Sequence, residues 1–196
     1  MATLNQGKMA PLLTHSDWLR APALVRVLET LERDGGQARV VGGSVRNALI
    51  GAPITDIDIA TPLLPAVVME RASRAGLGVH PTGIDHGTVT IVSDGHPFEV
   101  TTLRRDVETD GRRAVVAFSS DWREDAARRD FTMNALYADA RGEVFDYFAG
   151  LDDLAARRVR FIGDPHERIR EDYLRILRFF RFNAQIGEGQ PDPGGL

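Results

Sequence analysis

The stretch that decides the fold runs from residue 40 to residue 60 and reads VVGGSVRNALIGAPITDIDIA. It holds a Gly-Gly-Ser turn and then two aspartates, Asp56 and Asp58, in an apolar run that is typical of a strand. Side chains alternate between the two faces of a strand, so Ile57 and Ile59 can enter a core while both carboxylates emerge on the other side, roughly 6.5 Å apart at the backbone. This spacing allows the two carboxylates to share divalent cations.

The glycine turn and the aspartate pair together suit transfer of a phosphoryl or nucleotidyl group. Mg²⁺ binds carboxylate and phosphate oxygens. Backbone N–H groups can approach an anion at the glycines, which lack Cβ, and a helix starting near Ser44 would add the positive end of its dipole. Alone, an Asp-x-Asp is more often solvated surface, and Gly-Gly is usually a simple turn. Combined in this order, they predict a metal-dependent transfer site.

The composition indicates one globular head with room for a second small helical unit, since 196 residues with 43% hydrophobic content can bury one good core. No apolar run is long enough to span a membrane and residues 1–11 contain no signal core, so we expect a cytoplasmic protein. The absence of cysteine excludes disulfides, thiolate zinc sites and cysteine nucleophiles.

The net charge of −4 gives no overall basic field of the kind found in many nucleic-acid-binding proteins. The positive charge is almost all arginine, because Lys8 is the only lysine. Arginine suits bidentate recognition of phosphates and base edges, although compositional bias of the source genome explains the arginines at least as well.

Periodicity and turn signals predict a mixed α/β fold rather than a doubly wound parallel sheet, because short strands alternate with helices and antiparallel hairpins. Residues 1–16 are expected to form a loosely docked tail, residues 104–122 a flexible loop, and residues 187–196 a disordered end. Predicted helices cover residues 16 or 22 to 34, 45–50, 65–75 and 124–129, and a final helix starts after Asp164 with an apolar face of Ile169, Tyr173, Ile176, Leu177 and Phe180. Predicted strands cover residues 38–41, 55–60, 88–92, 97–103, 133–138 and 143–147.

Three further groups are candidates for the same site. Glu99 supplies a third carboxylate if its strand lies beside the aspartates, although a lone strand glutamate usually faces solvent. Residues 128–134 read RRDFTMN, in which the arginines can clamp phosphates and the Asp and Asn can bond a sugar; a helix end with a polar turn is an equally good reading.

The third group lies on the final helix, at spacings of three and four residues, opposite its apolar face. Such a group is normally a solvated face with ion pairs. It can also read a base edge, because Asp accepts from an exocyclic amine and Arg donates to ring acceptors. Its members are Glu171, Asp172, Arg175 and Arg178.

These segments resemble motifs A, B and D of class II tRNA nucleotidyltransferases, the family of CCA-adding enzymes and related bacterial poly(A) polymerases. The motifs are GGSVR at 42–46 with DID at 56–58, RRDFTMN at 128–134 and EDYLRILR at 171–178. The resemblance covers residues 22–183 in the family's order. It implies a polymerase-beta-like nucleotidyltransferase head with a mixed, mostly antiparallel sheet and flanking helices. The implied division is a tail over 1–21, a head over 22–150 and the start of an all-α neck over 151–196.

The resemblance also implies two Mg²⁺ ions, CTP and ATP as substrates, and the tRNA 3′ end as acceptor. Catalysis and metal binding fall to Asp56 and Asp58, with Glu99 as the third acid. Nucleotide and phosphate contacts fall to Gly43, Ser44, Arg46, Arg129, Asp130 and Asn134. Base selection falls to Asp172 and Arg175, supported by Glu171 and Arg178. Residues 104–122 correspond to the motif C region that helps the switch from C to A addition.

Two departures from the family pattern stand out. Asn47 occupies a position that is most often Asp, and the family continues past Leu196 into body and tail domains that hold tRNA. We therefore expect a catalytic head with a partial neck, whose main tRNA surface lies elsewhere. A poly(A) polymerase shares every motif quoted, and an inactive nucleotide-binding remnant or partner subunit is the alternative from another class.

Overall fold

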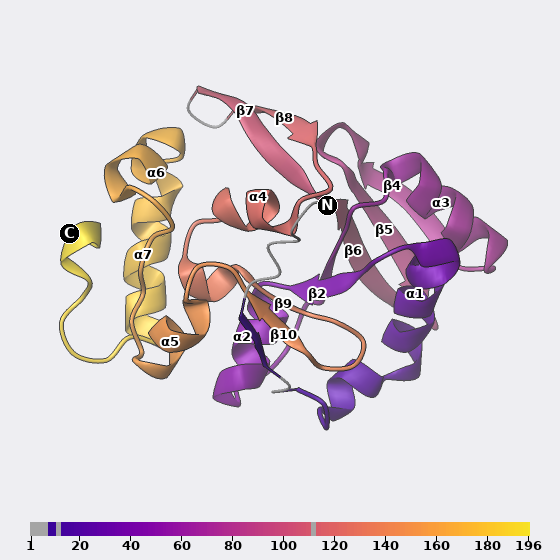
Figure 1. Ribbon diagram of the computed structural model, residues 1–196, viewed down its shortest axis with the longest axis horizontal. Helices are drawn as coiled ribbons and strands as arrows, with labels where there is room; N and C mark the ends of the chain where they lie inside the picture. The colour runs from indigo at the N-terminus through magenta and orange to yellow at the C-terminus, as the bar shows by residue number, and fades with distance from the viewer. Residues whose placement is uncertain (1–7, 11–12, 111–112) are drawn as a thin grey trace, which may run out of the picture.

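The computed structural model describes residues 8–10, 13–110 and 113–196 (Figure 1). Within these residues, eight strands form one sheet in the order β1-β10-β9-β2-β3-β6-β5-β4. Only β3 and β6 run parallel, so the expected mixed and mostly antiparallel sheet is confirmed. The strands are β1 Lys8–Ala10, β2 Arg39–Val41, β3 Asp58–Thr61, β4 Gly78–Gly83, β5 Thr88–Ser93, β6 His96–Thr102, β9 Leu136–Ala138 and β10 Val144–Asp146.

Helices α1 and α3 contact each other and β5, and form the core at one end of the molecule (Figure 1). The predicted stripe of α1 is fully buried, including Val27, Leu28 and Leu31. The α-helices are α1 Pro22–Glu32, α2 Gly43–Ile50, α3 Pro65–Arg74, α4 Trp122–Ala127, α5 Gly150–Ala155, α6 Pro165–Glu171 and α7 Leu174–Gln185. Short 3₁₀ turns cover Asp17–Arg20, Arg33–Gly35, Ile84–His86, Thr132–Asn134 and Pro193–Gly195. No helix of the described ranges is long and apolar enough to cross a membrane.

The predicted hairpin between β5 and β6 is confirmed, and its turn explains its register. Asp94 has a φ of 49° and Gly95 a φ of 78°. Two central residues with positive φ match the twist of a tight hairpin, which Asp-Gly favours. This hairpin fixes the position of β6, the strand that carries Glu99.

The prediction of a flexible loop over residues 104–122 is wrong for the residues that the structure describes there. β7, Arg104–Asp110, and β8, Arg113–Phe118, pair antiparallel in a separate two-stranded sheet that projects from the molecule (Figure 1). Polar and arginine-rich composition concealed the β-branched run in β8. Residues 111–112, at the centre of the expected loop, lie outside the described residues.

Strand β4 was missed because it contains Pro81 and two glycines, which argue against a strand. It lies at the edge of the sheet, where a proline need not donate to a neighbouring strand. The prediction of a loosely docked N-terminal tail is also wrong for the residues described there. Strand β1 pairs with β10, and Leu13 and Leu19 are buried in the core. Residues 1–7 and 11–12 lie outside the described residues.

The expected continuous final helix is divided at Asp172, whose φ of −155° and ψ of 106° are extended. Its cap is confirmed, since the Asp164 side chain accepts from the Glu167 backbone N–H at 3.0 Å. The expected apolar face is largely exposed, and Phe179 and Phe182 face the core instead. The end expected to be disordered folds back, with the Glu188 N–H donating to the Arg157 carbonyl at 3.2 Å.

Candidate functional site

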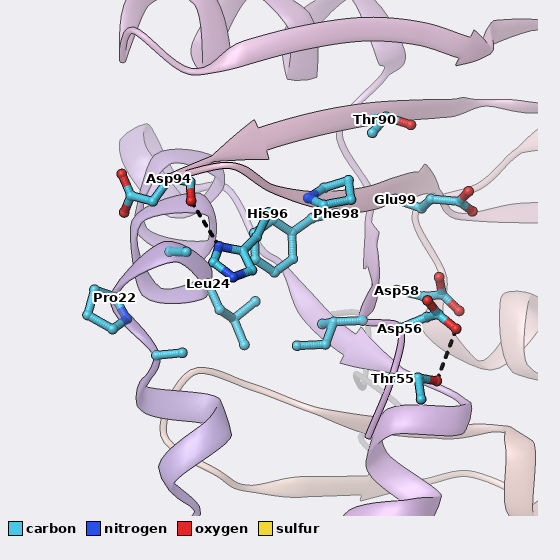
Figure 2. A pocket seen from close by; sticks show the side chains of 14 residues that line it. Pro22, Leu24, Thr55, Asp56, Asp58, Thr90, Asp94, His96, Phe98 and Glu99 are labelled. Atoms are coloured by element: carbon cyan, nitrogen blue, oxygen red, sulfur yellow. Dashed lines mark hydrogen bonds between the residues drawn. The ribbon is translucent and has the colours of Figure 1, made fainter. Parts of the chain in front are cut away.

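Three carboxylates gather where β3 and β6 lie side by side. The parallel register pairs Asp58 with Glu99. Asp56 precedes β3, but Ile57 packs against the core, so both aspartates point to the same side (Figure 2). Strand β3 begins at Asp58 instead of the predicted residue 55. The predicted alternation of side chains between the two faces holds. Thr55 Oγ1 donates to Asp56 Oδ2 at 3.0 Å.

The acidic surroundings of Asp58 favour binding of a cation next to its carboxylate. Partial burial raises the pKa of its carboxyl, the negative charges of Glu99 and Asp56 raise it further, and Arg129 opposes them. In the described parts of the chain, no group of three or more His, Cys, Asp or Glu side chains is placed to hold a metal ion. Mg²⁺ fits a smaller set, because it typically binds one or two carboxylates and takes its other ligands from water and substrate phosphates.

Asp58 lines two pockets. The first, about 800 Å³, extends from Asp56 and Glu99 along β6 to His96 (Figure 2). The second, about 540 Å³, brings five arginines to Asp58. Those arginines are Arg46, Arg128, Arg129, Arg175 and Arg178. The arginine-rich pocket, as we call the second, has the charge needed for a polyanion beside the carboxylates.

The glycine turn forms one wall of the arginine-rich pocket. Gly42, with a φ of 76° and a ψ of −124°, joins β2 to α2 in a conformation that requires glycine. Gly43 and Arg46 line the pocket as expected. Ser44 does not, because its side chain is buried and its hydroxyl donates to the Val41 carbonyl at 3.4 Å. Only the backbone N–H of Ser44 remains for the expected phosphate contact.

A chain of side-chain hydrogen bonds joins three segments that are distant in the sequence. Arg46 Nη1 donates to Asn134 Oδ1 at 2.5 Å, and Asn134 Nδ2 donates to Asp130 Oδ1 at 3.0 Å. Arg178 Nε donates to Asp130 Oδ2 at 2.7 Å. Asp130 is buried and bonds to protein groups through both oxygens, so it holds Asn134 and Arg178 in place. Asp130 also lines the arginine-rich pocket, and the ribose contact expected of it stays a prediction.

The two candidate base-selecting residues, Asp172 and Arg175, both line the arginine-rich pocket. Arg175 Nη1 donates to Glu171 Oε2 at 2.5 Å and to the Arg168 carbonyl at 2.8 Å, and Glu171 also pairs with Arg168 at 2.9 Å. Glu171 therefore holds the Arg175 side chain, and its expected part in base selection stays a prediction. The Asp172 carboxylate accepts from the Leu174 N–H at 3.0 Å and lies at the break between α6 and α7.

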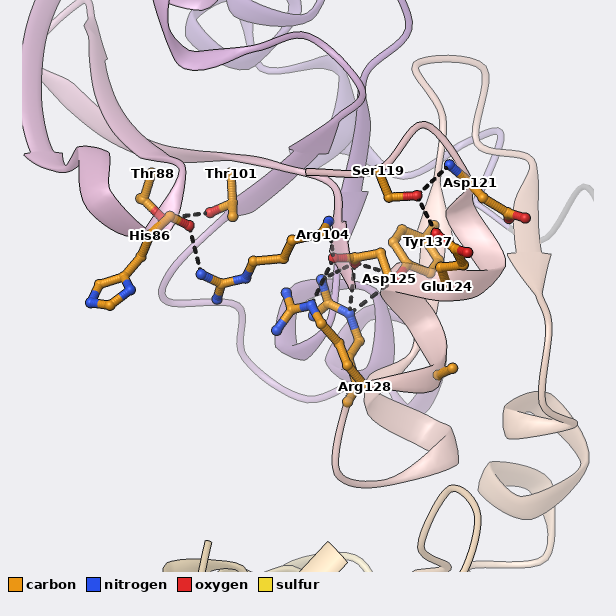
Figure 3. A network of polar contacts seen from close by, with 12 residues as sticks. His86, Thr88, Thr101, Arg104, Ser119, Asp121, Glu124, Asp125, Arg128 and Tyr137 are labelled. Atoms are coloured by element: carbon orange, nitrogen blue, oxygen red, sulfur yellow. Dashed lines mark hydrogen bonds and ion pairs between the residues drawn. The ribbon is translucent and has the colours of Figure 1, made fainter. Parts of the chain in front are cut away.

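The sequence analysis missed the buried polar groups behind this pocket. Asp125 is 1% exposed and accepts hydrogen bonds from Arg128, Arg129 and the Tyr137 hydroxyl (Figure 3). Burial favours a raised pKa for Asp125, but Arg129 and Arg128 outweigh it and lower the pKa to about 2. The available signal was its spacing of three and four residues from the arginine pair. On a helix, that spacing usually indicates only a surface ion pair.

The sequence matches a protein family and several known relatives. Residues 38–160 match the family described as poly A polymerase head domain. The chain is 44% identical over 176 residues to the human protein CCA tRNA nucleotidyltransferase 1, mitochondrial, covering 88% of this chain and 41% of that protein. It is 43% identical over 169 residues to the CCA-adding enzyme of Lacticaseibacillus paracasei, covering 85% and 42%.

Solved structures agree with these matches. The Bacillus stearothermophilus CCA-adding enzyme in complex with CTP has a TM-score of 0.78 and 36% identity, with 89% of this chain and 42% of that chain covered. A tRNA nucleotidyltransferase complexed with a primer tRNA and an incoming ATP analog has a TM-score of 0.69 and 30% identity, with coverages of 86% and 47%. The chain thus spans less than half the length of these relatives.

Proposed function

Since the chain belongs to the poly A polymerase head domain family, we propose that it is the nucleotide-transferring part of a CCA-adding enzyme, which adds CMP and AMP to the 3′ end of tRNA. The observation that carries the proposal is the arginine-rich pocket, where four arginines meet Asp58 and the pair Asp172 and Arg175. A nucleoside triphosphate has the matching parts: an anionic chain for the arginines and a base edge for the pair.

Different residues of the site have different proposed roles in metal and phosphate binding. Asp56 and Asp58, with Glu99 beside them, would hold two Mg²⁺ ions, which neutralise the triphosphate and activate the acceptor hydroxyl when bound. Arg46 and Arg129 bind phosphate oxygens, and the backbone N–H groups at the start of α2 add to the positive field. The arginine side chains keep their orientation because carboxylates and amides of the protein hold them.

Selection of C and A follows from hydrogen-bond chemistry. Cytosine and adenine both present an exocyclic amine next to a ring nitrogen acceptor. Asp172 can accept from the amine while Arg175 donates to the ring nitrogen. Guanine and uracil carry a carbonyl where the amine would be, which leaves the Asp172 carboxylate facing an acceptor. The protein side chains thereby replace a nucleic-acid template.

The alternatives differ in product. A poly(A) polymerase shares these motifs, and an inactive remnant would bind nucleotide without transfer. The relatives named as a CCA tRNA nucleotidyltransferase and as a CCA-adding enzyme favour the proposed function. The test incubates tRNA lacking its CCA end with CTP alone, ATP alone and both. Addition of CC, then of A, supports the proposal; long A tracts indicate a poly(A) polymerase, and no product with retained nucleotide binding indicates a remnant.

Other parts of the account stay predictions. The division of the chain into residues 1–21, a head over 22–150 and a helical neck over 151–196 stays a prediction, although β1 places part of residues 1–21 in the sheet of the head. The predicted neck includes α5 from its second residue, α6 and α7. Contact with tRNA beyond its 3′ end remains a proposal, because the chain covers 41% of the human relative. The cytoplasmic location also remains a prediction, since that relative is named as mitochondrial.

A further inference from the structure

Asp125 lies directly behind the arginine-rich pocket without lining it. Its Oδ1 accepts from Arg128 Nε at 3.0 Å, and its Oδ2 accepts from Arg129 Nη2 at 3.0 Å and from the Tyr137 hydroxyl at 2.8 Å (Figure 3). Tyr137 also accepts from Arg129 Nε at 3.2 Å. One buried carboxylate and one phenol therefore fix two guanidinium groups that do line the pocket.

Because Asp125 holds one edge of each guanidinium, the remaining N–H groups of Arg128 and Arg129 have a fixed direction. Arg129 bonds to Asp125 through the edge formed by Nε and Nη2, and its Nη1 lies on the side of Gly42 in the glycine turn. A guanidinium is a rigid, planar fork, so fixing one edge fixes the direction of the other N–H groups. Arg128 is likewise held through Nε. Both side chains would otherwise have several rotamers to sample.

Asp125 also connects these arginines to the β7–β8 hairpin. The Arg104 N–H, at the start of β7, donates to Asp125 Oδ1 at 3.4 Å. After β8, Ser119 Oγ donates to Glu124 Oε2 at 2.5 Å, in the same helix as Asp125 (Figure 3). Both ends of the hairpin are thus attached to α4, the helix that carries Asp125.

We propose that Asp125 is a positioning residue for nucleotide transfer: it orients Arg128 and Arg129 to bind the phosphates of the incoming nucleotide. This inference rests on the proposed function. A purely structural ion pair is the alternative, because removing one member of a buried pair destabilises a protein wherever the pair lies. The two readings differ in whether phosphate affinity changes in protein that remains folded.

The chain offers a matched control for this test. Asp153 is also fully buried and pairs with two arginines, accepting from Arg158 Nε at 2.8 Å and from Arg160 Nε at 2.8 Å. Neither of those arginines lines the arginine-rich pocket. Asp125→Asn and Asp153→Asn each remove a buried charge of the same kind, so a general loss of stability should affect both.

The experiment measures binding of CTP and of inorganic triphosphate by calorimetry, with Mg²⁺, in protein shown to be folded by circular dichroism. Asp125→Asn should weaken both ligands by roughly 10- to 100-fold, the range for one charge-assisted hydrogen bond. Asp153→Asn should bind both like the unmodified protein. Unchanged binding by folded Asp125→Asn, or an equal loss in Asp153→Asn, would overturn the inference.

A milder substitution keeps the inference testable if Asp125→Asn does not fold. Tyr137→Phe keeps the ring and removes one donor to Asp125 together with one acceptor for Arg129. It should weaken triphosphate binding severalfold, and unchanged binding would overturn the inference. Failure of the unmodified protein to bind CTP or triphosphate would instead remove the proposed function, and with it the premise of this inference.

Discussion

Asp58 is the residue on which the site depends, since its side chain borders both pockets and its backbone pairs with that of Glu99. The fold disfavours its ionised form, because neighbouring acids and partial burial raise its pKa. A carboxylate whose charged form is disfavoured by its surroundings is a candidate for function rather than a source of stability. The same reasoning does not apply to Asp125, whose lowered pKa makes its charge stabilising.

Asp58→Ala should abolish nucleotide incorporation while the folded protein keeps its stability or gains some, because a carboxylate with a raised pKa is removed. Radiolabelled incorporation and denaturant unfolding measure the two effects. Asp94→Asn is the control, since Asp94 lines the same 800 Å³ pocket away from the carboxylate cluster. Incorporation retained by Asp58→Ala would contradict the assignment of the metal site.

The low pKa of Asp125 makes a signed prediction for acid stability. The folded-state value of about 2 lies below the ordinary 3.8, so the stabilisation is complete above about pH 4 and is lost as the pH falls toward 2. The stability advantage of the unmodified protein over Asp125→Asn should therefore shrink by roughly 1 to 2 kcal/mol between pH 6 and pH 2.5. Urea unfolding at each pH measures it, and an advantage that does not change with pH would contradict the prediction.

At the scale of elements, the junction of β2 and α2 sets the wall of the arginine-rich pocket. Gly42→Ala should destabilise the protein by roughly 1 to 3 kcal/mol, because its backbone conformation is nearly closed to other residues. It should also weaken CTP binding, since α2 carries Arg46. Gly51→Ala is the control: Gly51 ends the same helix at a φ of 70° with open space around it, and its ordinary left-handed conformation costs alanine about 1 kcal/mol. Equal CTP affinity in both variants would contradict the assigned role of the turn.

The sequence predicted those elements whose signals are local. The α1 stripe and the Asp94-Gly95 hairpin depend on neighbouring residues, and both formed as expected. The edge strand β4 and the break at Asp172 depend on tertiary contacts, which composition does not reveal. The β7–β8 hairpin is local, but its polar and arginine-rich composition concealed it.

In the candidate site, too, some features could be predicted from local sequence and others depend on the fold. The motif residues could be named in advance, but the parallel register of Asp58 and Glu99 could not, because it depends on how two distant strands pair. The buried contact between Asp125 and Tyr137 also depends on the fold, whereas the spacing of Asp125 from Arg128 and Arg129 was a local signal. The inward turn of Ser44 also depends on the folded loop rather than on residue type.

At the scale of the whole molecule, α7 has one face in the core and another in solvent. Among the described residues, five of the nine exposed large apolar side chains lie between residues 173 and 180. Such a cluster exceeds what scattered surface residues usually present. The arrangement leaves Phe179 and Phe182 to anchor the helix, while Tyr173, Leu177 and Phe180 are available for contact.

We predict that the exposed apolar face of α7 causes concentration-dependent association and that Leu177→Asp reduces it. The melting temperature should not fall, because Leu177 is 67% exposed. Sedimentation velocity over a range of concentrations measures the association. Leu196→Asp is the control, because Leu196 is exposed but lies outside this face of α7. Identical sedimentation of all three proteins would show that the α7 face has no part in association.

The central claim is that one pocket joins the carboxylates, the arginines and the base-reading pair, and it is tested most directly by calorimetric titration of the four nucleoside triphosphates with Mg²⁺. The account predicts that CTP and ATP bind more tightly than GTP and UTP by about 1 to 3 kcal/mol, the value of a good bidentate base contact. It also predicts that the joint change Asp172→Ala and Arg175→Ala removes the difference. Equal affinity for all four nucleotides in the unmodified protein would contradict the claim, because Asp172 and Arg175 would then be surface charges and not a reader of the base.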